Sequence, residues 1–330
     1  MPNYSGVWSL KEQGVAVKGD RWPLPPILTS DSILLAQAYT GGGAAGYSNA
    51  ITRVSLSTGG QQNDYGDLTV GRNGLAAASS STRGLYIGGY ASGGVYSDVI
   101  DYITIATDGN ATDFGNMSAG ANENAAVSSS TRAVYRLGYA TSAASRTVEY
   151  VTISSTGNST DFGDTSYSNI SGQTGTCSTT RGVFTGGYQT TIGSPAQNVM
   201  DYFTIASTGN LTDFGNLNVA VSTPNSGICS SGTYGYTTGG SSTNHIQYIT
   251  IASTGNASDF GDLTYDTVDG AQSGNTTRGI ALGGYDTTTS GYQEVSFFTM
   301  GTSGSSSDWG DLTTNAGNCA ALSATHGGLS

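Results

Sequence analysis

The triplet Asp113-Phe114-Gly115 is one of six copies of the same pattern, an aspartate followed by an aromatic residue and a glycine. The six triplets begin at Asp64, Asp113, Asp161, Asp213, Asp259 and Asp308. Successive aspartates are 49, 48, 52, 46 and 49 residues apart. A period near fifty residues indicates a repeat architecture, and a unit of this length holds about four short strands. The triplets therefore predict an all-β fold built from propeller blades.

The second unit shows the expected order of strands most clearly. We predict a first strand over residues 75–81, a second over 85–90, a third over 99–105 and a fourth that opens at the triplet. A glycine pair or its equivalent recurs in the second strand, and we expect it to let neighbouring backbones approach closely. We expect the aromatic residue of each triplet to pack between adjacent blades.

The two ends of the repeat region complement one another. Residues 317–327 align with residues 73–84 and therefore read as a first strand, whereas the first unit begins directly with a second strand near residues 33–42. We therefore expect residues 317–325 to pair with the strand ending at Gly41. This pairing would give a six-bladed propeller over residues 31–330, closed by its C-terminal strand, because closure removes open sheet edges.

Composition and charge limit the classes of partner. Only 10% of the 330 residues are charged, 50 are glycine, and the formal net charge is −12. Residues 1–30 carry a balance of +1, so the repeat region carries −13. A body this acidic repels nucleic acid and anionic membranes, and we expect neither as a partner. We also predict no signal peptide and no membrane-spanning helix.

Residues 1–30 lie outside the repeat and resemble an attachment arm. Ser9 and Glu12 fit a capping box, which predicts a short helix from about Leu10 to Lys18. A proline-rich stretch from Trp22 should be extended. We expect four residues of the arm to anchor it to a partner: Trp8, Lys11, Lys18 and Trp22. The alternative is that the two tryptophans pack back on the protein itself.

Loop lengths distinguish the two faces of the predicted propeller. The step from the third strand to the triplet is 10 residues in every unit, whereas the step from the glycine pair to the third strand varies between 9 and 16. Binding usually lies on variable loops carried by a rigid scaffold. The variable loops supply six tyrosines as candidate contacts for a sugar: Tyr47, Tyr96, Tyr292, Tyr90, Tyr188 and Tyr285. The last three follow the glycine pairs in register, so their alternative role is in the scaffold, whereas the first three are less regular.

No constellation of residues indicates an enzyme, a metal site or a cofactor. The residues that resemble those of a sialidase repeat from unit to unit: the arginines Arg83, Arg132, Arg181 and Arg278 and the aspartates of the triplets. We interpret the arginines as hydrogen-bond donors between blades and the aspartates as buried caps of turns. The Asn-X-Ser/Thr sequences at 110, 158, 210 and 256 are interpreted as turns. Cys177, Cys229 and Cys319 form no CxxC motif and are expected to be small buried residues.

Leu85-Tyr86-Ile87-Gly88-Gly89-Tyr90 together with Phe114 resembles the kelch family of β-propellers. The sequence of residues 248–263 also resembles repeats in virion structural proteins of tailed marine phages, cyanophages among them. The opening residues 5–13 with Trp22-Pro23 are similar to openings of such phage fibre and tail proteins. These resemblances imply a non-enzymatic virion structural protein of tail, neck or fibre type that contacts other virion proteins through residues 1–30. A host-surface glycan and further copies of the chain in a homo-oligomer are the other expected partners. The alternative is a cellular kelch-like interaction scaffold.

Overall fold

All regular secondary structure in the computed structural model is β-strand across the residues that it describes, which are 32–36, 47–56, 62–140, 144–191, 195–285 and 292–329. For Tyr292 this covers the backbone only. The predicted attachment arm, its helix and its four anchoring residues Trp8, Lys11, Lys18 and Trp22 lie outside the described residues.

The strands form antiparallel runs in which neighbours along the chain also pair in space. The second unit forms β5 (Ala76–Ser79), β6 (Arg83–Ile87), β9 (Val99–Thr104) and β10 (Thr112–Asn116). The third forms β11 (Ala125–Ser128), β12 (Arg132–Arg136), β13 (Thr147–Thr152) and β14 (Thr160–Asp164). The fourth forms β16 (Thr174–Cys177), β17 (Arg181–Thr185), β19 (Gln197–Thr204) and β20 (Thr212–Val221). The strand order predicted from the second unit is thus confirmed.

The remaining runs include the two ends of the repeat. The fifth unit forms β22 (Tyr234–Thr238), β23 (Thr243–Thr250) and β24 (Ser258–Thr267). The sixth forms β25 (Ala271–Gly274), β26 (Arg278–Leu282), β27 (Tyr292–Thr299) and β28 (Ser307–Ala316). The first unit forms β1 (Ser32–Ala36), β2 (Ala50–Ser55) and β3 (Asn63–Asp67).

The C-terminal strand β29 (Ala320–Ser323) lies beside the first described strand. It pairs antiparallel with β1 in a register that joins Ile33 to Ser323 and Ala36 to Ala320. A short strand, β21 (Ser226–Gly227), pairs in parallel with both β29 and β25 and so links the first and sixth runs into one nine-stranded sheet. Of the predicted pairing between residues 317–325 and the strand ending at Gly41, the structure shows the part that joins Ala320–Ser323 to Ile33–Ala36, and Gly41 lies outside the described residues.

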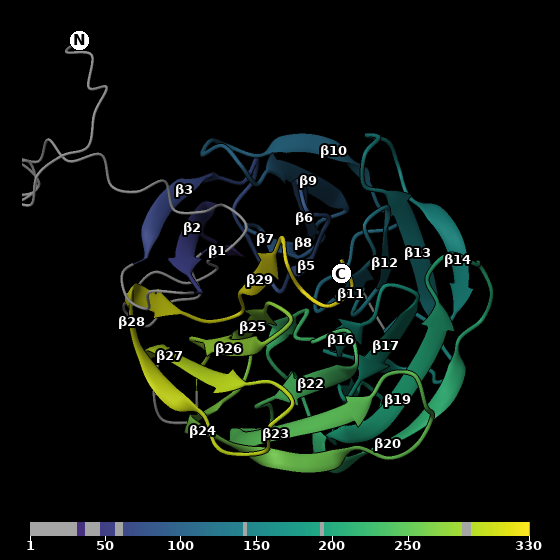
Figure 1. Cartoon of the computed structure of the whole chain (residues 1–330). Helices are drawn as coiled ribbons and strands as arrows, with labels where there is room; N and C mark the ends of the chain where they lie inside the picture. The colour runs from purple at the N-terminus through teal and green to yellow at the C-terminus, as the bar shows by residue number, and fades with distance from the viewer. Residues whose placement is uncertain are drawn as a thin grey trace, which may run out of the picture.

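The runs are arranged around a common centre, with their first strands innermost and their fourth strands at the rim (Figure 1). Figure 1 shows β5, β11, β16, β25 and β29 near this centre and β3, β10, β14, β20, β24 and β28 outside. The innermost strands consist mainly of small residues, as in Ala76-Ala77-Ala78-Ser79 of β5 and Thr174-Gly175-Thr176-Cys177 of β16. Small side chains allow several strands to converge, so these residues fit the crowded centre of a propeller-like, all-β fold.

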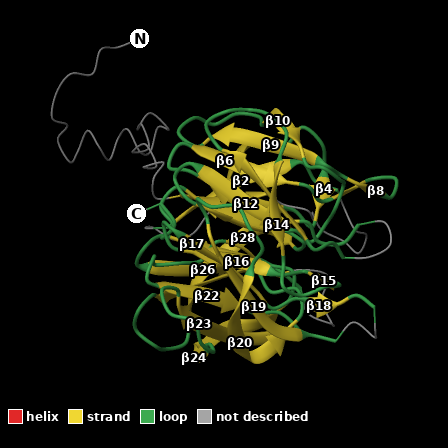
Figure 2. Cartoon of the chain, turned by 90° about the vertical axis from the view of Figure 1, so that its right-hand side faces the viewer, coloured by secondary structure: helices red, strands yellow, loops and turns green. Residues whose placement is uncertain are grey.

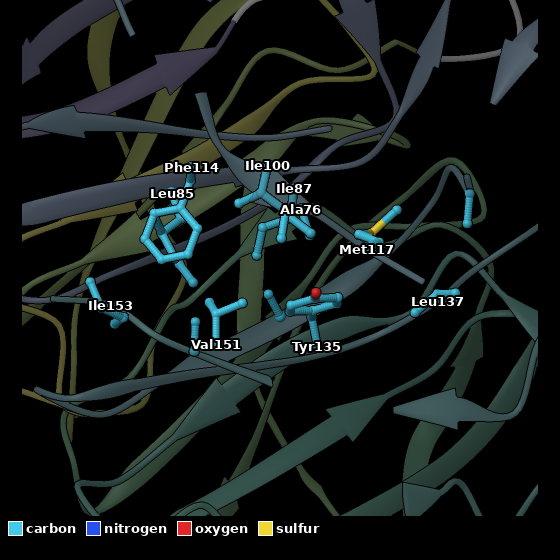
Figure 3. Packing of buried hydrophobic residues seen from close by; sticks show 14 residues of the cluster. Ala76, Leu85, Ile87, Ile100, Phe114, Met117, Tyr135, Leu137, Val151 and Ile153 are labelled. Atoms are coloured by element: carbon cyan, nitrogen blue, oxygen red, sulfur yellow. The ribbon is translucent and has the colours of Figure 1, made fainter. Parts of the chain in front are cut away.

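The hydrophobic core lies between neighbouring runs. One cluster combines Leu85, Ile87 and Phe114 of the second run with Tyr135 and Val151 of the third (Figure 3). Phe114 is 2% exposed, as are Phe162 and Phe214 in the same position of the next two units. The prediction that the aromatic residue of the triplet packs between blades is therefore confirmed.

The asparagine turns lie against the triplet of the preceding unit. Gly109 donates its amide hydrogen to the Tyr65 carbonyl at 2.8 Å, and the Asn110 side chain accepts from the Asp67 amide at 3.1 Å. The same side-chain contact is made by Asn158, Asn210 and Asn256 with the strands before them. These asparagines therefore act as turn residues that join one unit to the next.

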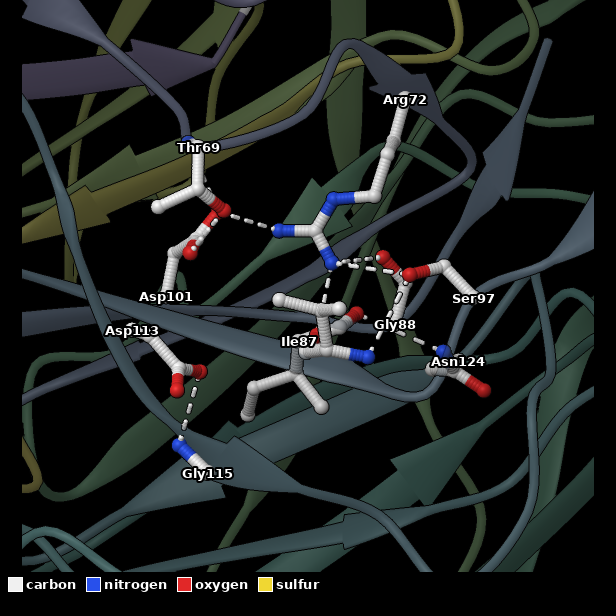
Figure 4. A network of polar contacts seen from close by, with 10 residues as sticks. Thr69, Arg72, Ile87, Gly88, Ser97, Asp101, Asp113, Gly115 and Asn124 are labelled. Atoms are coloured by element: carbon white, nitrogen blue, oxygen red, sulfur yellow. Dashed lines mark hydrogen bonds and ion pairs between the residues drawn. The ribbon is translucent and has the colours of Figure 1, made fainter.

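The aspartates of the triplets are exposed, so the prediction that they are buried is wrong. All six lie on the rim, where each fourth strand has a solvent-facing edge. Their capping role is local: Asp113 accepts a hydrogen bond from the amide of Gly115, two residues on, at 3.2 Å (Figure 4). Asp213 and Asp308 make the same contact. A carboxylate that caps its own turn at a sheet edge needs no burial, because water solvates its remaining lone pairs.

Candidate functional site

The loops separate into two faces, which Figure 2 shows from the side. One face carries the connections between second and third strands and those from each run to the next. We call it the loop face; in the second run it comprises residues 69–74, 88–98 and 117–124, and each other run contributes the equivalent connections. Three short strands there form a small sheet, β4 (Arg72–Asn73), β7 (Tyr90–Ala91) and β8 (Val95–Tyr96). Another two, β15 (Ile170–Ser171) and β18 (Tyr188–Gln189), pair on the same face. The opposite face carries the short turns and the C-terminus, and we call it the turn face.

Three of the predicted tyrosine contacts lie together on the loop face. With Tyr139 they form a row in which Tyr47 and Tyr90 have ring centroids 6.2 Å apart, Tyr90 and Tyr96 5.0 Å, and Tyr96 and Tyr139 6.0 Å. We call these four residues the tyrosine row. Each is half-buried, so one part of each ring packs and another part meets solvent. Such half-exposed aromatic faces suit stacking on a flat ligand.

Tyr47 and Tyr96 are more regular than expected. Their carbonyl oxygens lie against equivalent glycines of the next unit, Gly71 and Gly120, and they are 49 residues apart. The following serines also accept equivalent backbone hydrogen bonds, Ser48 from Arg72 and Ser97 from Ala121. The prediction that Tyr47 and Tyr96 are less regular than the tyrosines that follow the glycine pairs is therefore wrong. Tyr292 begins β27, but its side chain lies outside the described part of the structure.

Tyr188 and Tyr285 face the centre of the fold rather than the tyrosine row. The Tyr188 hydroxyl donates to Glu123 Oε2 at 2.5 Å, and the Tyr285 hydroxyl donates to Asp269 Oδ2. Burial and the adjacent carboxylate raise the pKa of both tyrosines, which keeps their hydroxyls protonated as donors. These two tyrosines therefore hold acidic side chains that the sequence did not single out.

Glu123 and Asp269 border a cavity at the centre of the loop face. The cavity has a volume of about 30 Å³ and is lined by Gly74, Leu75, Glu123, Asn124, Gly172, Gln173, Thr223, Pro224, Ser226, Asp269, Gly270, Asn318 and Cys319. About 10–15 Å³ of such space holds one water molecule, so the cavity accepts about two. These residues precede or begin the first strands of successive runs, so different units contribute to one small site.

A ring of left-handed residues shapes this cavity. One residue just before each first strand has positive φ: Gly74 (62°), Glu123 (54°), Gly172 (63°), Thr223 (41°), Asp269 (54°) and Asn318 (50°). They are 49, 49, 51, 46 and 49 residues apart, nearly the spacing of the triplets. Left-handed backbone is uncommon outside glycine and asparagine, and Thr223 is β-branched. Aligning the units at these positions would have found the ring, although the mixture of residue types conceals it.

Burial raises the pKa of both carboxyl groups in the cavity. For Asp269 the pKa rises to about 7, mainly through burial, with a contribution from the negative charge of Glu123 and an opposing one from the Tyr285 hydrogen bond. For Glu123 burial raises the pKa, and hydrogen bonds from Tyr188 and Ser171 oppose that rise. The Ser171 hydroxyl donates to Glu123 Oε2 at 3.0 Å. The two groups therefore influence each other and titrate closer to neutral pH than ordinary carboxyls.

The recurring arginines serve the scaffold, as predicted. Arg83, Arg132 and Arg181 donate to the carbonyls of Ile153, Ile205 and Ile251 in the following unit, at 2.8 to 3.0 Å. Each guanidinium also lies over a third-strand tyrosine of its own unit, as Arg132 does over Tyr150 at 4.1 Å. Arg278 makes the corresponding bond to the carbonyl of Leu56, which again joins the sixth run to the first. These arginines are spread over the turn face and do not converge on a ligand.

A buried ion pair supports the loop face beneath the tyrosine row. Arg72 and Asp101 are fully buried, 2.6 Å apart, and Arg72 also donates to the carbonyls of Gly88 and Val99 (Figure 4). The Thr69 hydroxyl and amide both donate to the same carboxylate. The Arg72 Nε has no hydrogen-bond partner among the described residues, but the other bonds of the pair hold adjacent loops in one arrangement, so it belongs to the scaffold of the face.

The other sequence candidates give no second site. Cys177, Cys229 and Cys319 are buried free thiols, and burial raises the pKa of Cys177 and Cys319 to about 12. Within the described ranges, no group of three or more His, Cys, Asp or Glu residues could hold a metal ion. The same part of the chain contains no helix long and apolar enough to cross a membrane.

No protein-family model and no curated protein matches the chain.

Proposed function

We propose that the chain forms a six-bladed, kelch-like β-propeller whose ring is closed by β29. The antiparallel pairing of β29 with β1 supports closure, because it joins the last strand of the chain to the first unit. The bond from Arg278 to the Leu56 carbonyl supports it too, since it repeats the contact that joins the other neighbouring units. The six triplets support the number of blades.

We further propose that the protein is a non-enzymatic structural component of a tailed-phage virion. On this proposal residues 1–30 attach it to other virion proteins and the propeller is exposed. Support comes from the resemblance of residues 248–263 and of the opening residues to phage proteins. It also comes from the structural roles of the recurring arginines and aspartates, which are the residues that resemble those of a sialidase.

The loop face is the part of the propeller that we propose meets the host surface. The tyrosine row is the observation that carries this proposal, since neighbouring half-exposed aromatic rings, here tilted or edge-to-face, beside neutral polar loops are typical of sugar recognition. A net charge of −12 favours a neutral or cationic glycan over an anionic one. Single contacts of this kind are weak, about 4 kcal/mol at millimolar affinity, so adhesion would depend on many copies in one particle.

Replacing Tyr47, Tyr96 and Tyr292 by alanine tests this function. We expect binding to a glycan array, or adsorption of the protein to host cells, to fall at least tenfold while the fold is retained. A matched control on the turn face replaces the exposed residues Thr107, Ser155 and Ser207 by alanine. Equal binding by the tyrosine variant and the control would mean that the loop face does not recognise a glycan through these residues.

A further inference from the structure

The cavity at the centre of the loop face combines features that no scaffold role explains. Its wall holds two carboxylates from different units, Glu123 before β11 and Asp269 before β25. Each is fixed on one oxygen by a tyrosine hydroxyl. Glu123 Oε1 accepts no hydrogen bond from the described residues, so acceptor capacity is left at the cavity. A ligand that donates hydrogen bonds, or carries positive charge, would complement it.

Gln173 supplies a second, independent indication of a ligand. Its side chain lines the same cavity although the residue is only 5% exposed. The carbonyl oxygen accepts from the Arg136 guanidinium, which fixes the orientation of the amide. The amide nitrogen donates no hydrogen bond to any other described residue. This nitrogen is not one of the fully buried, unpaired polar atoms of the described residues, so it is open to the cavity as a donor, and the cavity suits a ligand that also offers an acceptor.

The size of the cavity limits the ligand. A volume of about 30 Å³ accepts a group of a few non-hydrogen atoms, and a pyranose ring is too large to enter. We propose that the cavity binds a protonated primary amine with a hydroxyl group on the adjacent carbon. The ammonium group donates to Glu123 and Asp269, and the hydroxyl oxygen accepts from Gln173. Free amino alcohols and the edge of a deacetylated amino sugar both present this chemistry.

Charge makes the site sensitive to pH. The pKa of Asp269 is about 7, and that of Glu123 is also raised, so acid converts one or both acceptors to neutral carboxyls. The groups that face them are the protonated phenols Tyr188, Tyr285 and Tyr96 and the thiol Cys319, none of which supplies a cation. Arg136 lies behind Gln173 and is bonded to its oxygen. Affinity for the amine should therefore rise between pH 6 and pH 8.

Calorimetry with ethanolamine as the probe tests the proposal on the full chain. We expect millimolar binding at pH 8 that is at least fivefold weaker at pH 6, and at least fivefold weaker for methylamine, which lacks the hydroxyl. Glucosamine serves as the sugar arm and glucose as its amine-free control. Binding of glucosamine supports a glycan edge as the source, whereas binding of ethanolamine alone supports a free amino alcohol. Failure of ethanolamine to bind at pH 8 would overturn the proposal.

Matched variants locate the binding. Asp269→Asn and Glu123→Gln should each weaken ethanolamine at least tenfold. The exposed Asp266→Asn, which removes the same charge three residues away, should leave binding unchanged. Equal loss in all three would mean a general charge effect and no site. The Tyr47→Ala variant, which changes the tyrosine row at a residue that does not line the cavity, should bind ethanolamine normally, so the central cavity and the proposed glycan-binding row can fail separately.

Discussion

In the first five triplets the glycine lies where the neighbouring unit's turn makes contact. Gly115 has φ of 145°, and a Cβ atom there would lie 2.4 Å from the carbonyl oxygen of Gly157. Gly66, Gly163 and Gly215 meet the carbonyls of Gly109, Gly209 and Gly255 at the same distance. Side chains cannot occupy that space, since the obstacle is backbone. The third residue of the triplet therefore sets how closely two units approach.

Gly115→Ala should destabilise the fold more than Gly157→Ala. Both glycines have positive φ, of 145° and 155°, so both substitutions introduce backbone strain of about 1–3 kcal/mol. Only at Gly115 does the new methyl group also collide with a neighbouring carbonyl, because nothing lies within 4 Å of a Cβ on Gly157. We expect an additional loss of about 2 kcal/mol for Gly115→Ala, measured by urea unfolding. Equal losses would show that the contact can relax and does not set the spacing.

His326 should make the fold less stable in mild acid. It follows β29 and is fully buried, with its Nε2 3.2 Å from the Ser128 hydroxyl. Burial lowers its pKa from 6.5 to about 4. The folded state therefore resists protonation that the unfolded chain accepts, and stability is lost as pH falls from 6.5 towards 4, by about 3 kcal/mol in total.

The comparison with His326→Gln isolates this effect from other titrating groups. Asp269 acts in the opposite direction, because its raised pKa favours the folded state in acid and loses that contribution as pH rises towards 7. The difference in unfolding free energy between the wild type and the glutamine variant removes this common contribution. We expect that difference to shift against the wild type between pH 7.5 and pH 4.5. A difference independent of pH would mean that His326 is protonated in the fold.

At the scale of strands, the period of the triplets predicts the order of the strands and the partner of β29. It does so because the residues that make the repeated contacts between units, namely the aromatic residue, the asparagine turn and the arginine, recur at nearly constant spacing. The short strands β4, β7, β8, β15 and β18 were not predicted, since one or two residue pairs leave no alternating pattern. The ring of left-handed residues was missed for another reason. Its φ values come from how units meet, and Glu123 and Thr223 do not suggest them.

Removing residues 315–330 should lower the melting temperature sharply. It deletes β29 and with it the pairing to β1 and the parallel contacts with β21, so strand edges at the start of the chain are left open. It also removes Leu322 and Ala324 from the core that contains Leu34 and Ile51. Thermal unfolding followed by circular dichroism measures the change. A control chain that lacks only Ser330 should melt like the wild type.

Adding the deleted residues as a separate peptide provides the complementary experiment. A synthetic peptide of residues 315–330 should bind the truncated chain and restore part of its melting temperature, because the site for β29 lies between β1 and β21. A peptide with Ala321 replaced by aspartate should not, since Ala321 is fully buried between these strands. If the truncated chain melts like the wild type, the C-terminal strand does not hold the ends together.

At the scale of the whole molecule, the chain divides into two parts of opposite charge. Residues 1–30 contain both lysines of the chain and carry a balance of +1, whereas the repeat region carries −13. The tryptophans Trp8 and Trp22 lie in that same segment, apart from the repeated contacts that build the strands. Large apolar residues of this kind dominate interfaces when they are buried there. This division is why we propose attachment through the arm and recognition through the loop face.

Deleting residues 1–30 should separate folding from assembly. The first described strand begins at Ser32 and pairs with both β2 and β29, so these contacts do not depend on the deleted segment. We expect the shortened protein to keep the melting temperature of the full chain within a few degrees and to lose incorporation into particles, measured by sedimentation with virion proteins. A variant with Trp8 and Trp22 replaced by alanine should show the same loss in a full-length chain. Normal incorporation of both variants would place the anchor on the propeller and favour the alternative of an interaction scaffold, which needs no attachment arm.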